Sequence, residues 1–291
     1  MRETKVLLFL LIYLLVACEK PILTTDELPK SSSHANLTLS IFQLEQTPFS
    51  LLTRATPSEV CDRLNFAVYG MDGVRQKQIN QKIGDNDFGI AGFELSEGNY
   101  QLIAMAHSSN GNPTMTNPEK IQFTNAQGYS DTFLYYTTVT IDDEPQTLAL
   151  SLQRIVALCR FVISDAIPEW VTRLEFTYKG GSGHFNAKTG LGVTNSTQVV
   201  KFDVQAGKTQ TQYDLYTFLH NIEGTIHLKV TAYDAADNVQ HEREFDIPME
   251  QNNITWVMGD FFTGATPTTT QTVTSTVAID NAWSGEKHLT Y

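Results

Sequence analysis

Apolar and polar positions alternate with a period of two along most of the chain after residue 36. The alternation is clear in 37–42, 64–69 and 100–106, where apolar residues occupy every second position. Such alternation is typical of strands with one buried face. Gly, Asn and Asp turns separate these segments, and no long segment shows an apolar stripe with the helical period. The pattern therefore predicts an all-β protein built from sandwiches or barrels.

A denser apolar run, Leu148–Ile163, lies near the middle of the chain. It is long enough for two strands, one that closes a first domain and one that opens a second. A boundary after Leu152 divides the folded part into residues 36–152 and 153–291, which have similar lengths. Both lengths are ordinary for one domain. We therefore predict two consecutive β-sandwich domains.

The N-terminus has a different pattern. Two basic residues precede an unbroken apolar run that ends in Leu15-Val16-Ala17-Cys18. The run to Ala17 has twelve residues, fewer than the roughly 20 that a membrane-spanning helix needs, so residues 1–17 are predicted to be an export signal. The ending resembles a bacterial lipobox, in which Cys18 carries the lipid; an ordinary signal with an incidental cysteine is the alternative. Residues 18–35 are polar and are predicted to be a flexible tether.

The charge balance argues against two classes of binding partner. The chain has 32 acidic against 20 basic residues, a formal net charge of −12, and no compensating basic segment. This balance disfavours nucleic-acid binding and electrostatic adhesion to an anionic membrane. The lipid on Cys18 is therefore the predicted membrane anchor.

Two further cysteines, Cys61 and Cys159, leave two alternatives open. An exported protein works in an oxidising compartment, where they can form a disulfide. Each also lies in an apolar, strand-like segment, where a free cysteine behaves as a small hydrophobic residue. No Cys-x-x-Cys spacing occurs, and neither a metal site nor a cofactor is predicted.

Motifs that suggest catalysis are incomplete. The segment Gly180–His184 brings Ser and His together but lacks the closing glycine of a nucleophile elbow. Gly207-Lys208-Thr209 lacks the first glycine of a phosphate-binding loop. The acidic turns 85–87 and 234–238 do not complete a calcium-binding loop. We therefore predict that the protein is not an enzyme; a secreted hydrolase whose catalytic residues meet only in the fold is the alternative.

Four segments occur in a characteristic order, together with the lipobox. They are Arg63–Tyr69, Leu95–His107, Leu152–Ala157 and Ile279–Gly285. This order resembles the FimB-type fimbrial subunits of Bacteroides-like bacteria, which are lipoproteins of the minor or anchor kind, and the resemblance covers most of the chain from about Asn36. It implies two tandem transthyretin-like (Greek-key) β-sandwiches, no catalysis, and a role in assembling fimbriae with other fimbrial subunits.

The resemblance also implies β-strand complementation. In polymerising relatives an arginine-specific protease removes an N-terminal strand, and a strand from another subunit fills the groove by β-augmentation. In this chain the N-terminal plug strand corresponds to Leu37–Leu44, with Leu37, Leu39 and Ile41 on its apolar face. The cleavage site corresponds to Arg54-Ala55; an ordinary loop arginine is the alternative.

The C-terminal segment is the candidate donor strand. Val273, Val277 and Ile279 alternate with polar residues there. The alternative is that this segment is simply the last strand of the second sandwich.

The expected function is that of an outer-membrane anchor or accessory subunit of a fimbrium, which supports cell adhesion and contacts a host or bacterial surface ligand. One alternative is a tip or shaft fimbrillin released by cleavage after Arg54. Another is a surface glycan-binding lipoprotein, in which Trp170, Trp256 and Trp283 are exposed and stack on sugars.

Overall fold

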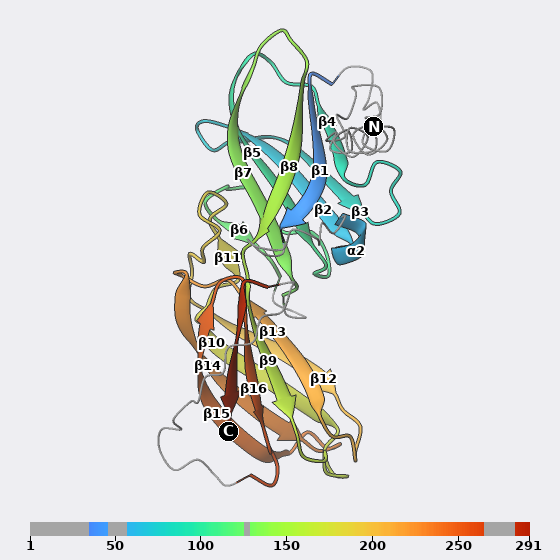
Figure 1. Ribbon diagram of the computed structural model, residues 1–291, viewed down its shortest axis with the longest axis vertical. Helices are drawn as coiled ribbons and strands as arrows, with labels where there is room; N and C mark the ends of the chain where they lie inside the picture. Colours follow the sequence, from blue (N-terminus) through green and yellow to red (C-terminus); the bar gives the residue numbers. More distant parts are fainter. Residues whose placement is uncertain (1–34, 46–56, 125–128, 265–282) are drawn as a thin grey trace, which may run out of the picture. The chain divides into compact units, whose positions relative to one another are not determined.

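The computed structural model describes residues 35–45, 57–124, 129–264 and 283–291. Within these ranges the chain forms 17 strands and one short helix, α2 (Pro57–Val60) (Figure 1). The all-β class predicted from the alternating pattern is confirmed. None of the helical structure in the described ranges has the length and hydropathy that crossing a bilayer requires.

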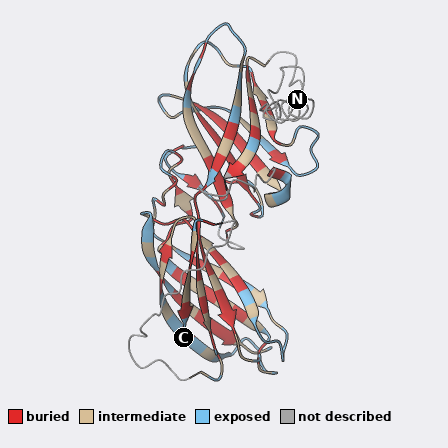
Figure 2. Ribbon diagram, viewed as in Figure 1, coloured by how far each residue is buried: buried red, intermediate tan, exposed pale blue. Residues whose placement is uncertain are grey.

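Seven strands of the first half form one sheet, in the order β3-β2-β5-β7-β8-β1-β4. They are β1 (Leu37–Glu45), β2 (Arg63–Gly70), β3 (Arg75–Lys82), β4 (Ile90–Phe93), β5 (Gly98–His107), β7 (Thr132–Ile141) and β8 (Gln146–Arg154). Strands β7 and β8 share two residue pairs, whereas β5 and β7 share ten, so the sheet folds over at the β7–β8 junction. Buried side chains from both parts of the sheet, including Leu39, Phe66 and Leu150, form one core. Figure 2 shows the buried positions along these strands in red.

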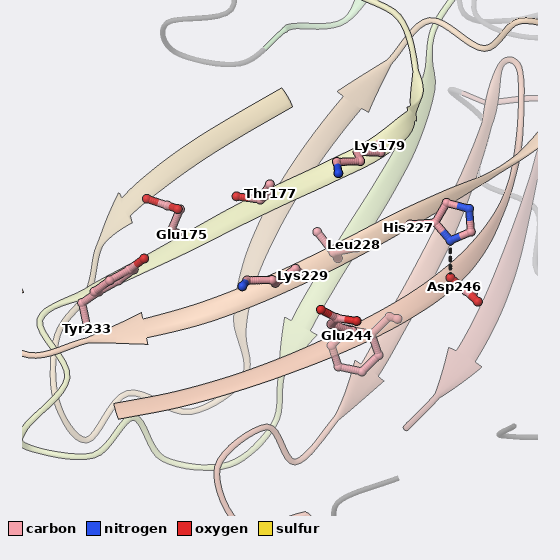
Figure 3. Close-up of a pocket in the computed structure, with 10 residues that line it drawn as sticks. Glu175, Thr177, Lys179, His227, Leu228, Lys229, Tyr233, Glu244 and Asp246 are labelled. Carbon is pink, nitrogen blue, oxygen red and sulfur yellow. Dashed lines mark hydrogen bonds and ion pairs between the residues drawn. The ribbon is translucent and has the colours of Figure 1, made fainter. Parts of the chain in front are cut away.

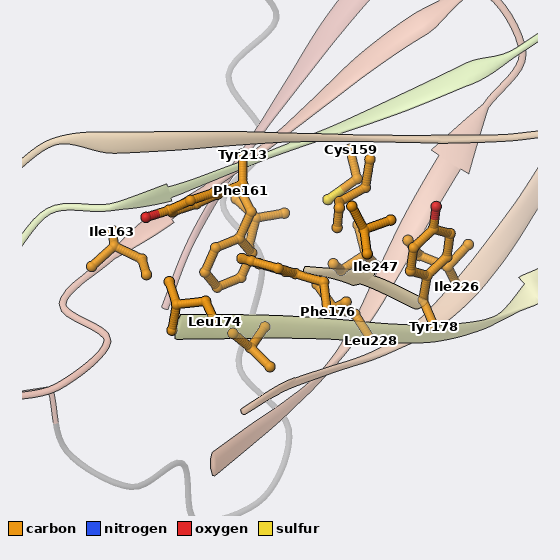
Figure 4. Packing of buried hydrophobic residues seen from close by; sticks show 14 of the residues in the cluster. Cys159, Phe161, Ile163, Leu174, Phe176, Tyr178, Tyr213, Ile226, Leu228 and Ile247 are labelled. Carbon is orange, nitrogen blue, oxygen red and sulfur yellow. The ribbon is translucent and has the colours of Figure 1, made fainter. Parts of the chain in front are cut away.

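The second half contains two four-stranded sheets, in the orders β12-β10-β14-β15 and β13-β9-β16-β17. Their strands are β9 (Ala157–Ile163), β10 (Arg173–Gly181), β12 (Ser196–Asp203), β13 (Thr211–Thr217), β14 (Glu223–Tyr233), β15 (Val239–Glu250), β16 (Asn253–Gly259) and β17 (Gly285–Thr290). The apolar faces of the two sheets share one core (Figure 4). In it Phe161 of β9 meets Phe176 of β10 edge to face, with ring centroids 5.6 Å apart, a favourable geometry for aromatic rings.

A third cluster of buried residues takes side chains from both halves. Strands β6 (Ile121–Gln122) and β11 (His184–Phe185) pair there as a small two-stranded sheet. The cluster also covers the second face of β2, where Ala67 and Tyr69 are fully buried. The Tyr69 hydroxyl donates a hydrogen bond of 2.7 Å to the Met115 carbonyl. Strand β2 is therefore buried on both faces, although its alternating sequence predicted only one.

The change from the first sheet to the second half occurs between Arg154, the end of β8, and Ala157, the start of β9. The predicted boundary after Leu152 lies two residues before the end of β8. Ala35–Tyr291 forms one compact unit, so independent folding of the two halves stays a prediction.

Candidate functional site

Strand β1, the predicted plug, lies between β4 and β8 in the first sheet. It runs antiparallel to β4 over Leu37–Ser40 and parallel to β8 over Leu37–Glu45. Both of its edges are therefore hydrogen-bonded. Removal of β1 would leave unpaired N–H and C=O groups on two strands at once, which is the condition that favours capture of another strand.

The apolar face of β1 is buried in the first core. Leu37 and Leu39 are 0% exposed and Ile41 is 6% exposed. The pairing with β8 shifts by one residue after Ile41, as in a β-bulge. The shift leaves Phe42 47% exposed and turns Leu44 inward, where it is 0% exposed. Four apolar side chains therefore seat this strand; its role as a plug stays a prediction.

Asn36 fixes the start of β1 to both neighbouring strands. Its side-chain Nδ2 donates to the Leu95 carbonyl at 2.8 Å, and its Oδ1 accepts from the Leu95 N–H at 3.0 Å. Its backbone N–H donates to the Phe93 carbonyl at 3.0 Å, and its carbonyl accepts from the Gln146 N–H at 2.9 Å. These four hydrogen bonds define where the strand enters the sheet.

The remaining processing and donor residues lie outside the described ranges. They are Cys18, Arg54, Ala55, Val273, Val277 and Ile279. Lipidation, cleavage and strand donation at these positions therefore stay predictions. The last strand that the structure describes is β17, which pairs in parallel with β16 and ends the order of its sheet.

Arg154 connects the first half to the residues that lead into β17. Its guanidinium donates two hydrogen bonds of 2.7 Å to the Asp131 carboxylate and lies over the ring of Trp283, 4.0 Å from the centroid. A third bond of 3.2 Å reaches the side chain of Asn252. In sequence Arg154 is only a polar interruption of an apolar run, and no spacing signal marks its partners.

The structure corrects the disulfide alternative, because Cys61 and Cys159 are both free and buried. Cys61 belongs to the core of the first sheet and Cys159 to the core between the two sheets of the second half. A disulfide requires Cα atoms within about 7 Å, which two separate cores do not offer. Burial raises the pKa of the Cys61 thiol to about 12 and also raises that of Cys159.

Of the three tryptophans, Trp283 is buried, Trp256 is partly buried and Trp170 is exposed. Trp256 of β16 has the Arg160 guanidinium 4.9 Å from its ring centroid and is stacked on His288, with centroids 5.5 Å apart. Because β16 lies between β9 and β17, these contacts take opposite sides of the indole. Trp283 is 5% exposed, whereas Trp170 is 45% exposed. The three rings therefore do not form one exposed platform.

In the Gly180–His184 segment, the Ser182 hydroxyl stabilises a turn by bonding to backbone groups. The Ser182 hydroxyl donates to the His184 carbonyl at 2.6 Å and accepts from the backbone N–H groups of His184 and Thr194, both at 3.1 Å. Within the described residues no group of three or more His, Cys, Asp and Glu side chains is placed to hold a metal ion.

A surface hollow of about 510 Å³ lies on the outer face of β10, β14 and β15 (Figure 3). Lysines and carboxylates alternate across these strands. Lys229 pairs with Glu242 at 2.8 Å, and Lys201 pairs with Glu175 at 3.1 Å. Part of the charge on this face is therefore neutralised by cross-strand neighbours, as on an ordinary solvated sheet.

The sequence matches a family model described as a family of unknown function, DUF6562, over residues 29–290. No curated protein matches the chain. The solved structures similar to it include a candidate adhesin from Bacteroides ovatus, with 15% identity, a TM-score of 0.50, and coverage of 80% of this chain and 87% of that one.

A candidate polysaccharide-binding protein from Bacteroides thetaiotaomicron has 14% identity and a TM-score of 0.47, over 71% of this chain and 78% of that one. The fimbrial anchor protein Mfa2 from Porphyromonas gingivalis has 13% identity and a TM-score of 0.41, over 71% of this chain and 80% of that one. At such identities the likeness concerns the fold alone. Because the family model covers most of the sequence, the chain belongs to the DUF6562 family.

Proposed function

We propose that this chain is a non-enzymatic structural subunit of a bacterial surface fimbrium, built for β-strand complementation and held at the outer membrane by a lipid on Cys18. The observation that carries the proposal is the position of β1 between two other strands of its sheet, β8 and β4. It pairs with β4 on one edge and with β8 on the other. In a chain without β1, the facing edges of β4 and β8 would lose their hydrogen-bond partners, and another strand could bind between them.

The burial of the apolar side chains of β1 favours a bound strand at this position in the sheet. Burial of one large aliphatic side chain contributes about 1.5–3 kcal/mol. Leu37, Leu39, Ile41 and Leu44 are all buried, so together they contribute roughly 6–12 kcal/mol by the same scale. A free energy of this size keeps β1 in place in the intact chain, and it is equally available to a strand from another subunit.

The anchor assignment rests on the lipobox and on the FimB-type resemblance. The candidate adhesin from Bacteroides ovatus, whose fold is similar, supports a role at the cell surface in adhesion. In an anchor the chain from Cys18 through β1 stays continuous, because the lipid is attached at its start. Contacts with other fimbrial subunits, and with a host or bacterial surface ligand, follow from this role.

The glycan-binding alternative, in which several tryptophans form a platform, has less support. Trp256 and Trp283 are covered by neighbouring side chains. That alternative therefore depends on Trp170 alone.

Mass spectrometry of the mature protein from outer-membrane fractions tests the proposal. An anchor has an acylated Cys18 at its N-terminus, and Cys18→Ala moves the protein out of the membrane fraction. A mature chain that begins only at Ala55 would contradict the anchor and would favour the released tip or shaft fimbrillin.

A further inference from the structure

The loop between β5 and β6 contains the one Asn-Gly pair of the sequence, Asn110-Gly111. Asn110 is exposed and Gly111 is partly exposed, so water reaches both residues. An asparagine followed by glycine is prone to an internal reaction, because a residue without a Cβ does not obstruct the approach of its backbone nitrogen to the neighbouring side-chain amide. The pair lies outside every strand that the structure describes, so a reaction there is separate from strand complementation.

The loop is fixed on both sides of this pair. On the N-terminal side the Ser109 N–H donates to His107 Nδ1 at 3.1 Å, and the Ser109 hydroxyl lies 2.9 Å from the Ser130 hydroxyl. On the C-terminal side the Asn112 Oδ1 atom accepts from the Asn65 side-chain amide at 3.1 Å. Asn65 is a fully buried residue of β2, so this bond ties the loop to the first sheet. The pair therefore spans the short interval between two attached residues.

Gly111 itself has the freedom that such a reaction needs. Its φ is 91°, in the left-handed region that favours glycine. Apart from its chain neighbours, no heavy atom lies within 4 Å of the position that a Cβ would take. Among the residues that the structure describes, none accepts a hydrogen bond from the Gly111 N–H. Its nitrogen can therefore lose its proton and turn toward the Asn110 side chain without giving up a hydrogen bond of its own.

The Asp-Gly pair of the β2–β3 turn, Asp72-Gly73, shows the opposite arrangement. The Gly73 N–H donates to the Gly70 carbonyl at 3.0 Å, and Asp72 Oδ1 accepts from the Val74 N–H at 3.0 Å. Both the glycine nitrogen and the acidic side chain of that pair are therefore engaged in the turn. The hydrogen bonding of the glycine nitrogen thus distinguishes the two pairs.

We propose that Asn110 deamidates spontaneously through Gly111, which makes this loop a modification site. The Gly111 nitrogen gives its proton to water or hydroxide and bonds to Asn110 Cγ; the Cγ–Nδ2 bond breaks, and ammonia leaves. The product is a five-membered succinimide. Water then breaks one of the two C–N bonds of the ring. Cleavage at Cγ gives aspartate, and cleavage at the backbone carbonyl carbon gives isoaspartate, in which the chain runs through the side chain. The net reaction consumes one water and releases one ammonia.

The two products differ in their effect on the loop. Each adds a carboxylate, but isoaspartate also adds one methylene to the backbone between Ser109 and Asn112. Because both of these residues are attached to the sheet, the added length displaces Asn112 from Asn65. The buried Asn65 amide then keeps only its bond to the Asn80 Oδ1 atom, at 2.8 Å. Formation of isoaspartate therefore loosens the loop, whereas formation of aspartate changes its charge alone.

Incubation of the folded mature chain at 37 °C, followed by peptide mapping with mass spectrometry, tests the proposal. Asn110 should convert to a mixture of aspartate and isoaspartate, faster at pH 9 than at pH 7, because the attacking nitrogen must lose its proton. Asn112 and Asn117 are internal controls, since each precedes a proline, whose nitrogen has no hydrogen to lose. A synthetic peptide of residues 108–113 is the positive control. An unmodified Asn110 in the folded chain under conditions that deamidate the peptide would overturn the proposal, as would an equal rate at Asn112.

Two variants separate the reaction from its consequence. Asn110→Gln should deamidate at least tenfold more slowly than the parent chain, because its longer side chain closes a six-membered ring; equal rates would overturn the proposal. Freshly prepared Asn110→Asp has the charge of the products and the normal backbone. The isoaspartate form, separated by chromatography, should therefore have a lower thermal midpoint than Asn110→Asp. Equal midpoints would overturn the displacement of Asn112.

Discussion

The guanidinium of Arg154 lies 4.0 Å from the ring centroid of Trp283. Arg154 ends β8, and Trp283 directly precedes the short approach to β17, so one contact joins the first sheet to the last strand. The Asp131 carboxylate holds the guanidinium with two hydrogen bonds. Arg154 of the first half therefore holds the ring of Trp283, two residues before β17 begins.

This contact makes Arg154 a large contributor to stability. The side chain of Arg154 is 2% exposed and that of Asp131 is 20% exposed, so Arg154→Ala leaves a largely buried carboxylate unpaired. Such a change costs about 3–5 kcal/mol. Lys229→Ala is the control, because its pair with Glu242 has side chains 43% and 38% exposed and should contribute about 1 kcal/mol or less. Urea denaturation of both variants measures the difference, and equal losses would contradict it.

The burial pattern of β1 predicts that substitutions at two nearby positions of the strand change the free energy of unfolding by different amounts. Leu39→Ala removes a fully buried side chain and should lower the free energy of unfolding by about 2–5 kcal/mol. Phe42 is 47% exposed, so Phe42→Ala should change it by about 0.5 kcal/mol or less. Denaturant titrations at equal protein concentration compare them. A larger loss in Phe42→Ala would show that the strand is seated with the opposite face inward.

His107 predicts a specific dependence of stability on pH. Burial, with a smaller contribution from Arg63, lowers the pKa of His107 to about 4, whereas an unfolded histidine has a pKa of about 6.5. Between these values only the unfolded state takes up the proton, so stability is full above pH 6.5 and falls as the pH is lowered. The loss from pH 6.5 to pH 5 is about 2 kcal/mol. Unfolding of the parent chain and of His107→Gln at both pH values checks this, and parallel losses would exclude His107 as the cause.

Because both cysteines are free and buried, we expect their thiols to be unreactive in the native protein. Burial raises the pKa of the Cys61 thiol to about 12, and Cys159 is fully buried; only the thiolate reacts readily. In a chain with Cys18→Ser, a thiol reagent such as Ellman's reagent should therefore find no reactive group in the native state and both thiols after denaturation. Reducing agents should leave the thermal midpoint unchanged. A midpoint that falls on reduction would restore the disulfide.

The period-two pattern predicts the strands well but not everything that covers them. The inward positions Leu37 and Leu39 follow directly from alternation, and both are buried. Leu44 breaks that alternation and is buried because the register shifts after Ile41, which a local pattern does not reveal. Tyr69 is buried by a cluster from distant segments, so its environment depends on tertiary structure.

The candidate site residues also fall into two groups: those that local spacing predicts and those that only the tertiary structure brings together. Residues on one strand can be predicted from their spacing, whereas Arg154, Asp131 and Trp283 meet only in the folded chain. The disulfide alternative failed for a related reason. Cysteine count and compartment say nothing about which core each of Cys61 and Cys159 enters.

The most direct test of strand complementation uses a chain that begins at Pro57 and a synthetic peptide of residues 35–45. The shortened chain lacks β1 and exposes the seat between β4 and β8, so it should be less stable than the intact chain. The peptide should bind it saturably and raise its thermal midpoint, whereas the same peptide with Leu39→Asp should not. A shortened chain that has the thermal midpoint of the intact chain and does not bind the peptide would contradict the account.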